Sequence, residues 1–241
     1  MKIAILADSL ALPRQKEAGD TPYETTYPFL LERDLRRKWG HDEIAIIERG
    51  LRRRTIENVV EDWFEIVELR KPEVVVVHVG IVDCAPRVFL RKERDFVERL
   101  RPARLRAPIL NFAHEHRRRI VQFRKKVYVS PERFEAGVDR VIELAWKCNL
   151  KSLVFVNIIS PPVEMEERSP GFLKNVETYN RLLENKAQRS NVNVIDLNNL
   201  LSLNGGTKAL TVDGIHLSPE GHRLLANVLE DHIGTLLTAR P

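Results

Sequence analysis

Five short apolar segments, spread along the chain, constrain its fold more than any other feature of the sequence. They are rich in Ile and Val and lack the alternation of apolar and polar residues that is typical of a sheet with one solvent-exposed face. This favours parallel strands covered on both sides. Helical patterns separate them, at 25–38, 55–70, 131–147, 172–188 and 218–237. The alternation of strand and helix predicts a doubly wound α/β sheet. Its predicted strands are 2–6, 43–47, 73–80, 152–159 and 192–197.

The length of the chain suits one domain of this kind. Its 241 residues, 43% of them hydrophobic, are enough for one sizeable core, and no linker divides them. We therefore expect a single domain over residues 1–241. One segment, about 84–130, fits the alternation poorly and is predicted to be a helical insertion over the carboxyl edge of the sheet.

Charge is concentrated in that insertion. Between Arg87 and Lys126 the sequence has 14 Lys or Arg and 4 Asp or Glu, an excess of +10 in a chain whose net charge is +5. A solvated helical face is one interpretation. The other is an electropositive lid that concentrates an anionic substrate. Aromatic residues are too sparse among these charges to favour nucleic acid.

The expected location is the cytoplasm. No apolar run approaches the roughly 18 residues that span a bilayer, and the N-terminus has no signal-peptide cleavage pattern. Cys84 and Cys148 each lie among apolar neighbours. Two thiols in a reduced compartment are the simplest interpretation, although a disulfide between them stays open.

Three polar residues follow predicted strands or precede a helix at the carboxyl edge of the sheet. Ser9 follows the first strand and is either a helix cap or a nucleophile. Asp213 and His216, three residues apart before the last helix, form either a solvated loop or a pair in which the carboxylate orients the imidazole as a base. Active sites of such sheets lie at this edge, which favours the chemical interpretation of all three.

The order of these motifs resembles the SGNH or GDSL hydrolases. The nucleophile motif G-D-S-L stands here as ADSL (7–10), and the glycine after the second strand is Gly50. The third motif, G-x-N-D, stands here as GIVD (80–83), and the last, D-x-x-H, as DGIH (213–216). The segment NIISPP (157–162) is similar to the end of the family's fourth strand. The resemblance covers nearly the whole chain.

This resemblance implies a three-layer α/β/α fold with five parallel strands in flavodoxin-like order. It implies that Ser9 is the nucleophile, His216 the general base and acid, and Asp213 the orienting carboxylate. The backbone N–H groups of Ser9 and Gly50 would be two donors of the oxyanion hole. No cofactor and no metal are expected.

One departure concerns the third oxyanion donor. Val82 stands where the family has asparagine, and valine cannot donate a hydrogen bond. Arg87 is the favoured substitute because its guanidinium is always charged. Asp83 would serve as the third donor if it were kept protonated. Without a third donor, the enzyme would be slow or would have lost hydrolysis. Alternatively, Asp83 and Arg87 simply pair with each other.

Other side chains that could take part in catalysis or metal binding are predicted to have structural roles. His78 lies inside an apolar strand and is predicted to be a core histidine. Cys84 is predicted to be a small, buried hydrophobic residue. The sequence HEH (114–116) resembles a metal pair, but nearby arginines would repel a cation. His222 and His232 are expected to be exposed on the last helix.

The expected function is a serine esterase that removes a small acyl group, by analogy acetyl, from a carbohydrate or other anionic small substrate. Two rivals stay open: an O-acyltransferase on the same triad, and a binding protein that has lost turnover. The sequence predicts no membrane span, and it leaves the oligomeric state open.

Overall fold

The computed structural model describes residues 1–14, 21–40, 44–190 and 192–238. Its centre is one sheet of five parallel strands in the order β2-β1-β3-β4-β5, which is the predicted flavodoxin-like order. The predicted strand 43–47 begins one residue outside the described ranges. The strands are β1 (Lys2–Ala7), β2 (Ala45–Glu48), β3 (Val74–His78), β4 (Ser152–Val156) and β5 (Asn193–Ile195).

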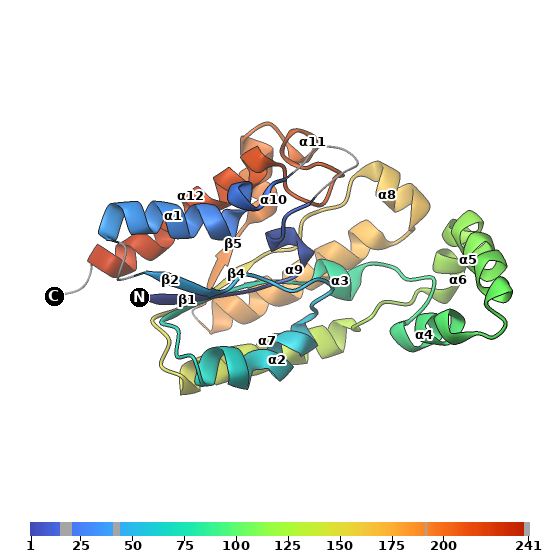
Figure 1. Cartoon of the computed structure of the whole chain (residues 1–241), viewed down its shortest axis with the longest axis horizontal. Coiled ribbons are helices and arrows are strands. Elements are labelled where there is room, and N and C mark those ends of the chain that lie inside the picture. Colours follow the sequence, from blue (N-terminus) through green and yellow to red (C-terminus); the bar gives the residue numbers. More distant parts are fainter. Residues whose placement is uncertain (15–20, 41–43, 191, 239–241) are drawn as a thin grey trace.

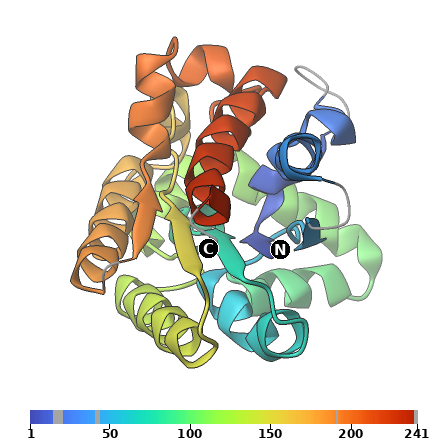
Figure 2. The same ribbon diagram turned by 90° about the vertical axis from the view of Figure 1, so that its left-hand side faces the viewer.

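Helices cover both faces of this sheet, which makes three layers (Figures 1 and 2). On one face α1 (Tyr27–Trp39) packs against α12 (Pro219–Thr238). On the other face α7 (Pro131–Lys147) packs between α2 (Ile56–Trp63) and α9 (Phe172–Arg189). Double coverage explains why β1, β3 and β4 are apolar along almost their whole length.

Two of the predicted helices begin at residues whose side chains cap them. Thr55 caps α2, and Ser130 caps α7 through the Arg133 N–H, with Pro131 at the first helical position. The helical pattern 55–70 is observed as α2 followed by a π-helical turn, η3 (Phe64–Glu68). Short helices complete this part of the chain: η1 (Ser9–Ala11), η2 (Tyr23–Thr25), α3 (Ile81–Cys84), α8 (Val163–Arg168), α10 (Leu197–Leu203) and α11 (Thr207–Leu210).

The basic segment after β3 forms a helical projection beyond the carboxyl edge of the sheet (Figure 1). It consists of α4 (Arg91–Arg99), η4 (Ala103–Leu105), α5 (Arg106–Glu115) and α6 (Arg117–Arg124), and we call it the α4–α6 lobe. Val88, Ala113 and Val121 form a small apolar cluster of their own there, separate from the main core. Across the described ranges, no helix is both long and apolar enough to cross a bilayer.

Candidate active site

Ser9 lies just beyond the carboxyl end of β1, the strand between β2 and β3 in the sheet. The chain leaves β1 at Ala7, and the next residue, Asp8, is the N-cap of η1: its Oδ1 accepts a hydrogen bond of 2.9 Å from the Leu10 N–H. Ser9 is therefore the first residue of η1 and not its cap. Because Asp8 satisfies the helix terminus, the Ser9 hydroxyl is free for another partner.

Asp213 and His216 lie in the loop between α11 and α12. An antiparallel bridge between Thr211 and Leu217 closes this loop at its base. Gly214 has φ +86°, and a Cβ at that position would come within 2.4 Å of the Pro162 ring. The loop is thus seated on the segment after β4, and only glycine fits there.

These three residues form a continuous line of contacts. Ser9 Oγ lies 3.1 Å from Nε2 of His216, and Nδ1 of the same ring lies 2.9 Å from Asp213 Oδ2. Asp213 also accepts the backbone N–H of His216 at 2.8 Å, which fixes the carboxylate relative to the ring. The arrangement joins residues 207 positions apart in sequence. It has the connectivity by which an imidazole takes a proton from a hydroxyl.

Arg14 completes this line and was not singled out by the sequence patterns. Its guanidinium forms an ion pair with Asp213 Oδ2. Burial alone would raise the pKa of Asp213, but the hydrogen bonds from His216 and Arg14 outweigh it and hold that pKa well below the ordinary value. Asp213 is therefore a stable anion. A lone arginine in a loop after β1 carries no local signal, so only the fold identifies it.

Gly50 lies against the segment that leads into Ser9. It has φ +112°, and a Cβ there would approach the Asp8 carbonyl oxygen to 3.2 Å and the Ala7 carbonyl oxygen to 3.3 Å. Glycine therefore allows the two segments to touch. The Gly50 N–H donates to the side chain of Glu48 at 3.3 Å, a long hydrogen bond that a substrate oxygen would have to replace.

Asp83 is withdrawn from solvent. It is completely buried, and its Oδ1 accepts the Ile56 N–H at 2.9 Å, at the start of α2. Burial raises the pKa of Asp83 to about 7. Asp8 is likewise fully buried, and burial raises its pKa to about 8, with the nearby charge of Asp83 adding to the shift.

Arg87 is half-buried and turns back on its own chain. Its Nη2 donates to the Val82 carbonyl at 2.8 Å, and its guanidinium lies 4.2 Å from the centre of the Tyr128 ring. Arg87 and Asp83, both within the described ranges, form no ion pair with each other, so the simple pairing considered from their spacing is wrong. Each has a closer partner supplied by tertiary structure.

The histidines of the last helix correct a second expectation. His222 is buried, not exposed, and its Nδ1 accepts the Tyr27 N–H at 3.1 Å. His232 is half-buried, with Nε2 3.0 Å from Ser152 Oγ. The long helix α12 packs against α1 and the sheet, so helix position alone did not reveal which side each ring faces.

The structure also describes His78, both cysteines and the segment 114–116. His78 is buried in β3 with Nδ1 3.3 Å from the Tyr27 hydroxyl, and Cys84 is a buried free thiol. Cys148 is also free. His114 and His116 belong to no group of metal-binding side chains among the described residues.

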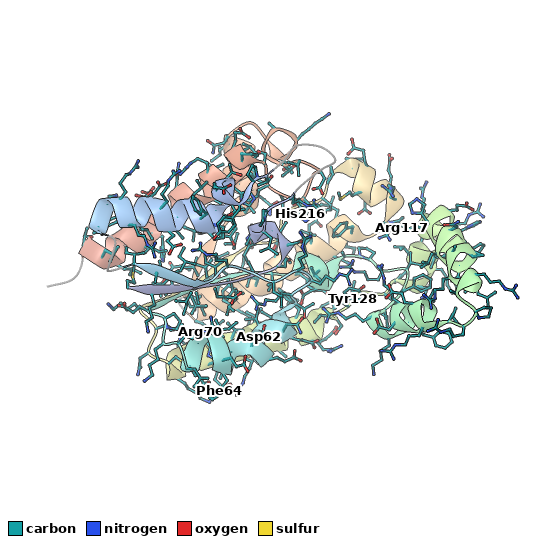
Figure 3. All side chains as sticks on the ribbon, in the orientation of Figure 1. Asp62, Phe64, Arg70, Arg117, Tyr128 and His216 are labelled. Carbon is teal, nitrogen blue, oxygen red and sulfur yellow. The ribbon has the colours of Figure 1, made fainter. Side chains whose placement is uncertain are left out.

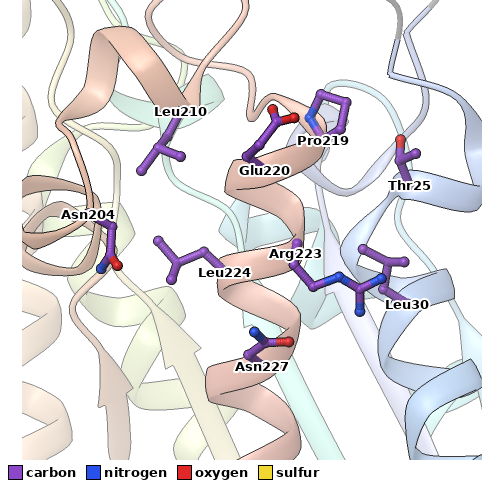
Figure 4. Close-up of a pocket in the computed structure, with 9 residues that line it drawn as sticks. All are labelled: Thr25, Leu30, Asn204, Leu210, Pro219, Glu220, Arg223, Leu224 and Asn227. Atoms are coloured by element: carbon purple, nitrogen blue, oxygen red, sulfur yellow. The ribbon is translucent and has the colours of Figure 1, made fainter.

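Two cavities lie near these elements. One, of about 490 Å³, borders Asp213 and Gly214 and reaches Pro162, Met165 and Arg168. Figure 4 shows another, of about 520 Å³, along α12, where Arg223 and Leu224 face Leu30 and Leu210. The second has none of Ser9, Asp213 and His216 in its lining. His216 lies at the edge of the sheet nearer the α4–α6 lobe, to which Arg117 belongs (Figure 3).

Comparisons with known proteins are consistent with this architecture. The model of the GDSL-like lipase/acylhydrolase family matches residues 16–224, a stretch that contains Gly50, Asp213 and His216 and begins after Ser9. A search of curated proteins finds no match.

Solved structures share the fold over nearly the whole chain. An acetylxylan esterase from Geobacillus stearothermophilus is 20% identical, with a TM-score of 0.64 over 97% of this chain and 94% of its own. A lipase/acylhydrolase from Enterococcus faecalis is 16% identical, with a TM-score of 0.65 over 96% and 94%. An α/β hydrolase from the metagenome of Lake Arreo, Spain, is 19% identical, with a TM-score of 0.64 over 97% and 94%.

Proposed function

The chain belongs to the GDSL-like lipase/acylhydrolase family and is an ester hydrolase, and we propose that it works through a triad of Ser9, His216 and Asp213. The observation that carries this proposal is the line of contacts from the Ser9 hydroxyl through the His216 ring to the Asp213 carboxylate. Serine needs such an adjacent base, because its own pKa is too high to supply an alkoxide at neutral pH. Catalytic mutants of the Geobacillus esterase also replace a serine and an aspartate.

In the proposed reaction, His216 Nε2 accepts the Ser9 proton as Oγ attacks the ester carbonyl. Asp213 holds the Nδ1–H of the ring and stabilises the imidazolium that forms. His216 then protonates the leaving alcohol, and an acyl-enzyme remains on Ser9. Water attacks this ester with His216 again as base, and the acid leaves as the hydroxyl of Ser9 is restored.

The backbone N–H groups of Ser9 and Gly50 would stabilise the oxyanion, once Glu48 releases the Gly50 N–H. Of the two candidate third donors, Arg87 suits the role better. Asp83 is fully buried and bonded to Ile56, whereas Arg87 is half-buried and its Nε has no hydrogen-bond partner among the described residues. Loss of one such donor typically costs about 10²–10³ in rate, so Arg87→Gln should lower kcat by roughly that factor.

The proposed substrate is an acetylated carbohydrate or another small ester. This rests on analogy with the acetylxylan esterase neighbour, whose likeness to this chain is in the fold. Water is the proposed acyl acceptor, and a sugar hydroxyl in its place would make the protein an O-acyltransferase. Partition of a labelled acetyl group between water and an added sugar separates the hydrolase from an O-acyltransferase.

The triad is tested with a serine-reactive phosphonate and a short-chain aryl ester. Ser9→Ala should abolish labelling and lower kcat by up to roughly 10⁶, and Asp213→Asn should lower kcat by about 10⁴. Ser202→Ala, which changes an exposed serine of α10, is the matched control and should behave as wild type. Labelling or turnover that persists in Ser9→Ala would remove Ser9 from the mechanism.

A further inference from the structure

A second concave site, lined largely by arginine, lies between the loop after β2 and the α4–α6 lobe. Its volume is about 360 Å³, and its walls come from the loop after β2, from α2, from α4 and from Tyr128. Asp62 and Tyr128 of this wall are labelled in Figure 3. The lining contains the arginines 52, 53, 54, 91 and 94 but only two acidic residues, so it carries a net charge of +3. We call it the arginine pocket.

The positive charge of the arginine pocket is only partly neutralised. Arg94 pairs with Glu98, but Arg52 and Arg53 are exposed and have no carboxylate partner in the part of the chain that the structure describes. Arg91 donates to the Arg53 carbonyl at 3.0 Å and, within the described ranges, also forms no ion pair with a carboxylate, although its charge acts on the buried Asp83. Three guanidinium groups on one concavity repel each other unless an anion lies between them.

Arg54 gives independent evidence for a ligand. Its side chain is only 3% exposed, and Nη2 donates to Asp62 at 2.9 Å. Its Nε and Nη1 have no hydrogen-bond partner among the described residues, and the nearest carboxylate oxygen, of Glu48, is 3.6 Å from Nη1. Buried donors are nearly always satisfied in folded proteins. Nη1 has only the long ion pair with Glu48 and Nε has no partner, so both call for an acceptor that the described residues do not supply.

The backbone of the pocket is held in an unusual shape. Arg53 has φ +64°, the left-handed region that a residue with a Cβ seldom adopts. The Arg91 guanidinium that binds its carbonyl also lies 5.3 Å from the centre of the Tyr128 ring, which orients it. Strained residues held by their surroundings are concentrated at binding and catalytic sites.

The arginine pocket opens at the same edge of the sheet as Ser9. Leu51, which lines it, donates its N–H to the Ala7 carbonyl at 2.9 Å, two residues before Ser9. Leu51 also follows Gly50 directly, the residue proposed for the oxyanion hole. Consecutive Cα atoms are about 3.8 Å apart, so the pocket starts within one or two residues of the reacting centre. A substrate with its ester at Ser9 and an anionic group in the arginine pocket would pass along Gly50 and Leu51.

We propose that the arginine pocket binds a phosphate group of the substrate, which makes the enzyme an esterase of phosphorylated small molecules such as acylated sugar phosphates. This inference rests on the proposed function. A phosphate dianion matches the net charge of +3 better than a single carboxylate, and its oxygens accept the paired N–H groups of guanidinium. A nucleobase would need a free ring to stack on, but the Tyr128 ring already has Arg87 and Arg91 against it.

The test compares two esters and two matched variants. The esters are an acetylated hexose and the same acetylated hexose carrying a phosphomonoester. Arg52→Gln/Arg53→Gln removes two adjacent charges from the arginine pocket, and Arg118→Gln/Arg119→Gln removes two adjacent exposed charges from α6. The readout is the ratio of kcat/KM for the phosphorylated ester to kcat/KM for the neutral one, which cancels any general loss of folded enzyme.

The wild type and the α6 variant should prefer the phosphorylated ester, and the pocket variant should lose at least about tenfold of that preference, because charge-assisted hydrogen bonds to phosphate are strong. Inorganic phosphate should bind the wild type more tightly than the pocket variant by calorimetry. Equal ratios in wild type and pocket variant would overturn the proposal, as would an equal preference for a hexuronic acid ester without phosphate.

These outcomes separate the two proposals. If Ser9→Ala abolishes turnover of the neutral ester and the two ratios are equal, the triad stands and the phosphate site fails. If inorganic phosphate binds and Arg52→Gln/Arg53→Gln abolishes the binding, while Ser9→Ala leaves turnover unchanged, the phosphate site stands and the triad fails.

Discussion

At the scale of single residues, two buried carboxyl groups hold the backbone around the proposed site. Asp8 caps η1 directly before the nucleophile, and Asp83 anchors the start of α2. Each has a second oxygen, Oδ2, without a hydrogen-bond partner in the described ranges. A buried carboxylate in such a place is costly, so the protonated form is favoured.

Asp83 should therefore make stability depend on pH. Its folded pKa of about 7 lies above the ordinary aspartate pKa of 3.8, so the folded state holds a proton that the unfolded state has lost between these pH values. The sign follows from linkage: this contribution is complete below pH 4 and is lost as pH rises to about 7. Asp83→Asn, which keeps an oxygen for the Ile56 N–H, should not show the loss.

The measurement is urea unfolding of wild type and Asp83→Asn from pH 4 to 7. The free energy of unfolding of the variant, relative to wild type, should rise with pH by up to about 1.4 kcal/mol per unit. Asp231→Asn, at an exposed position of α12, is the control and should track the wild type. A difference between Asp83→Asn and wild type that is constant with pH would contradict the assignment.

At the scale of elements, the α4–α6 lobe and the sheet are stabilised by different cores. The lobe packs around Val88, Ala113 and Val121, with Phe89 and Ile120 against them, whereas the sheet has a much larger cluster. Small apolar clusters under long connections stabilise their region locally, and such regions open at a lower free energy than the global core. The lobe is therefore expected to open without the sheet.

Val121→Ala tests this expectation. Val121 is buried in the lobe cluster, and its truncation should cost about 2 kcal/mol through lost burial and a cavity. Hydrogen exchange should accelerate in α4–α6 and stay unchanged in β3. Val138→Ala, at a buried position of α7 in the main core, should accelerate exchange in both regions. Equal acceleration of β3 by Val121→Ala would show that lobe and sheet open together.

At the scale of the whole molecule, Tyr27 joins three distant parts of the chain. Its hydroxyl lies 3.3 Å from Nδ1 of His78 in β3, and its N–H donates to Nδ1 of His222 in α12. Both rings are buried, and burial lowers the pKa of each to about 3. Protonation of either ring would place a charge between the sheet and the helices α1 and α12.

Protonation of these two rings in acid should therefore oppose folding. The unfolded state binds protons at these histidines below pH 6.5 and the folded state does not until about pH 3. Their contribution to stability is therefore complete above pH 6.5 and falls as pH drops, opposite in sign to the contribution of Asp83. His222→Asn keeps an acceptor for the Tyr27 N–H and removes one proton site. Relative to wild type, the unfolding free energy of the variant should therefore rise as pH falls from 6.5 to 4, by up to about 1.4 kcal/mol per unit.

Thermal unfolding measured at several pH values checks this prediction. The control is His114→Asn, which changes an exposed histidine of α5 and should leave the pH profile of wild type intact. Parallel profiles for wild type and His222→Asn would show that His222 does not contribute to the acid loss.

Local sequence determined the strands, the principal helices and the motifs that carry the proposed chemistry. Apolar runs predict buried strands because their side chains meet similar surroundings on both faces, and the ADSL, GIVD and DGIH motifs follow the chain in order. The family and the strand order are confirmed. The single-domain organisation and the roles of Ser9, Asp213 and His216 stay predictions.

Only the tertiary structure decided which side chains meet. Arg14 beside Asp213, Arg87 on the Val82 carbonyl, His222 inside the core and Arg54 without full partners all depend on segments far apart in sequence. A charged or polar side chain has several possible partners of similar strength, and its local sequence does not choose among them. Packing of the remote segments makes that choice, because it sets which groups are buried together and which must find an acceptor from outside.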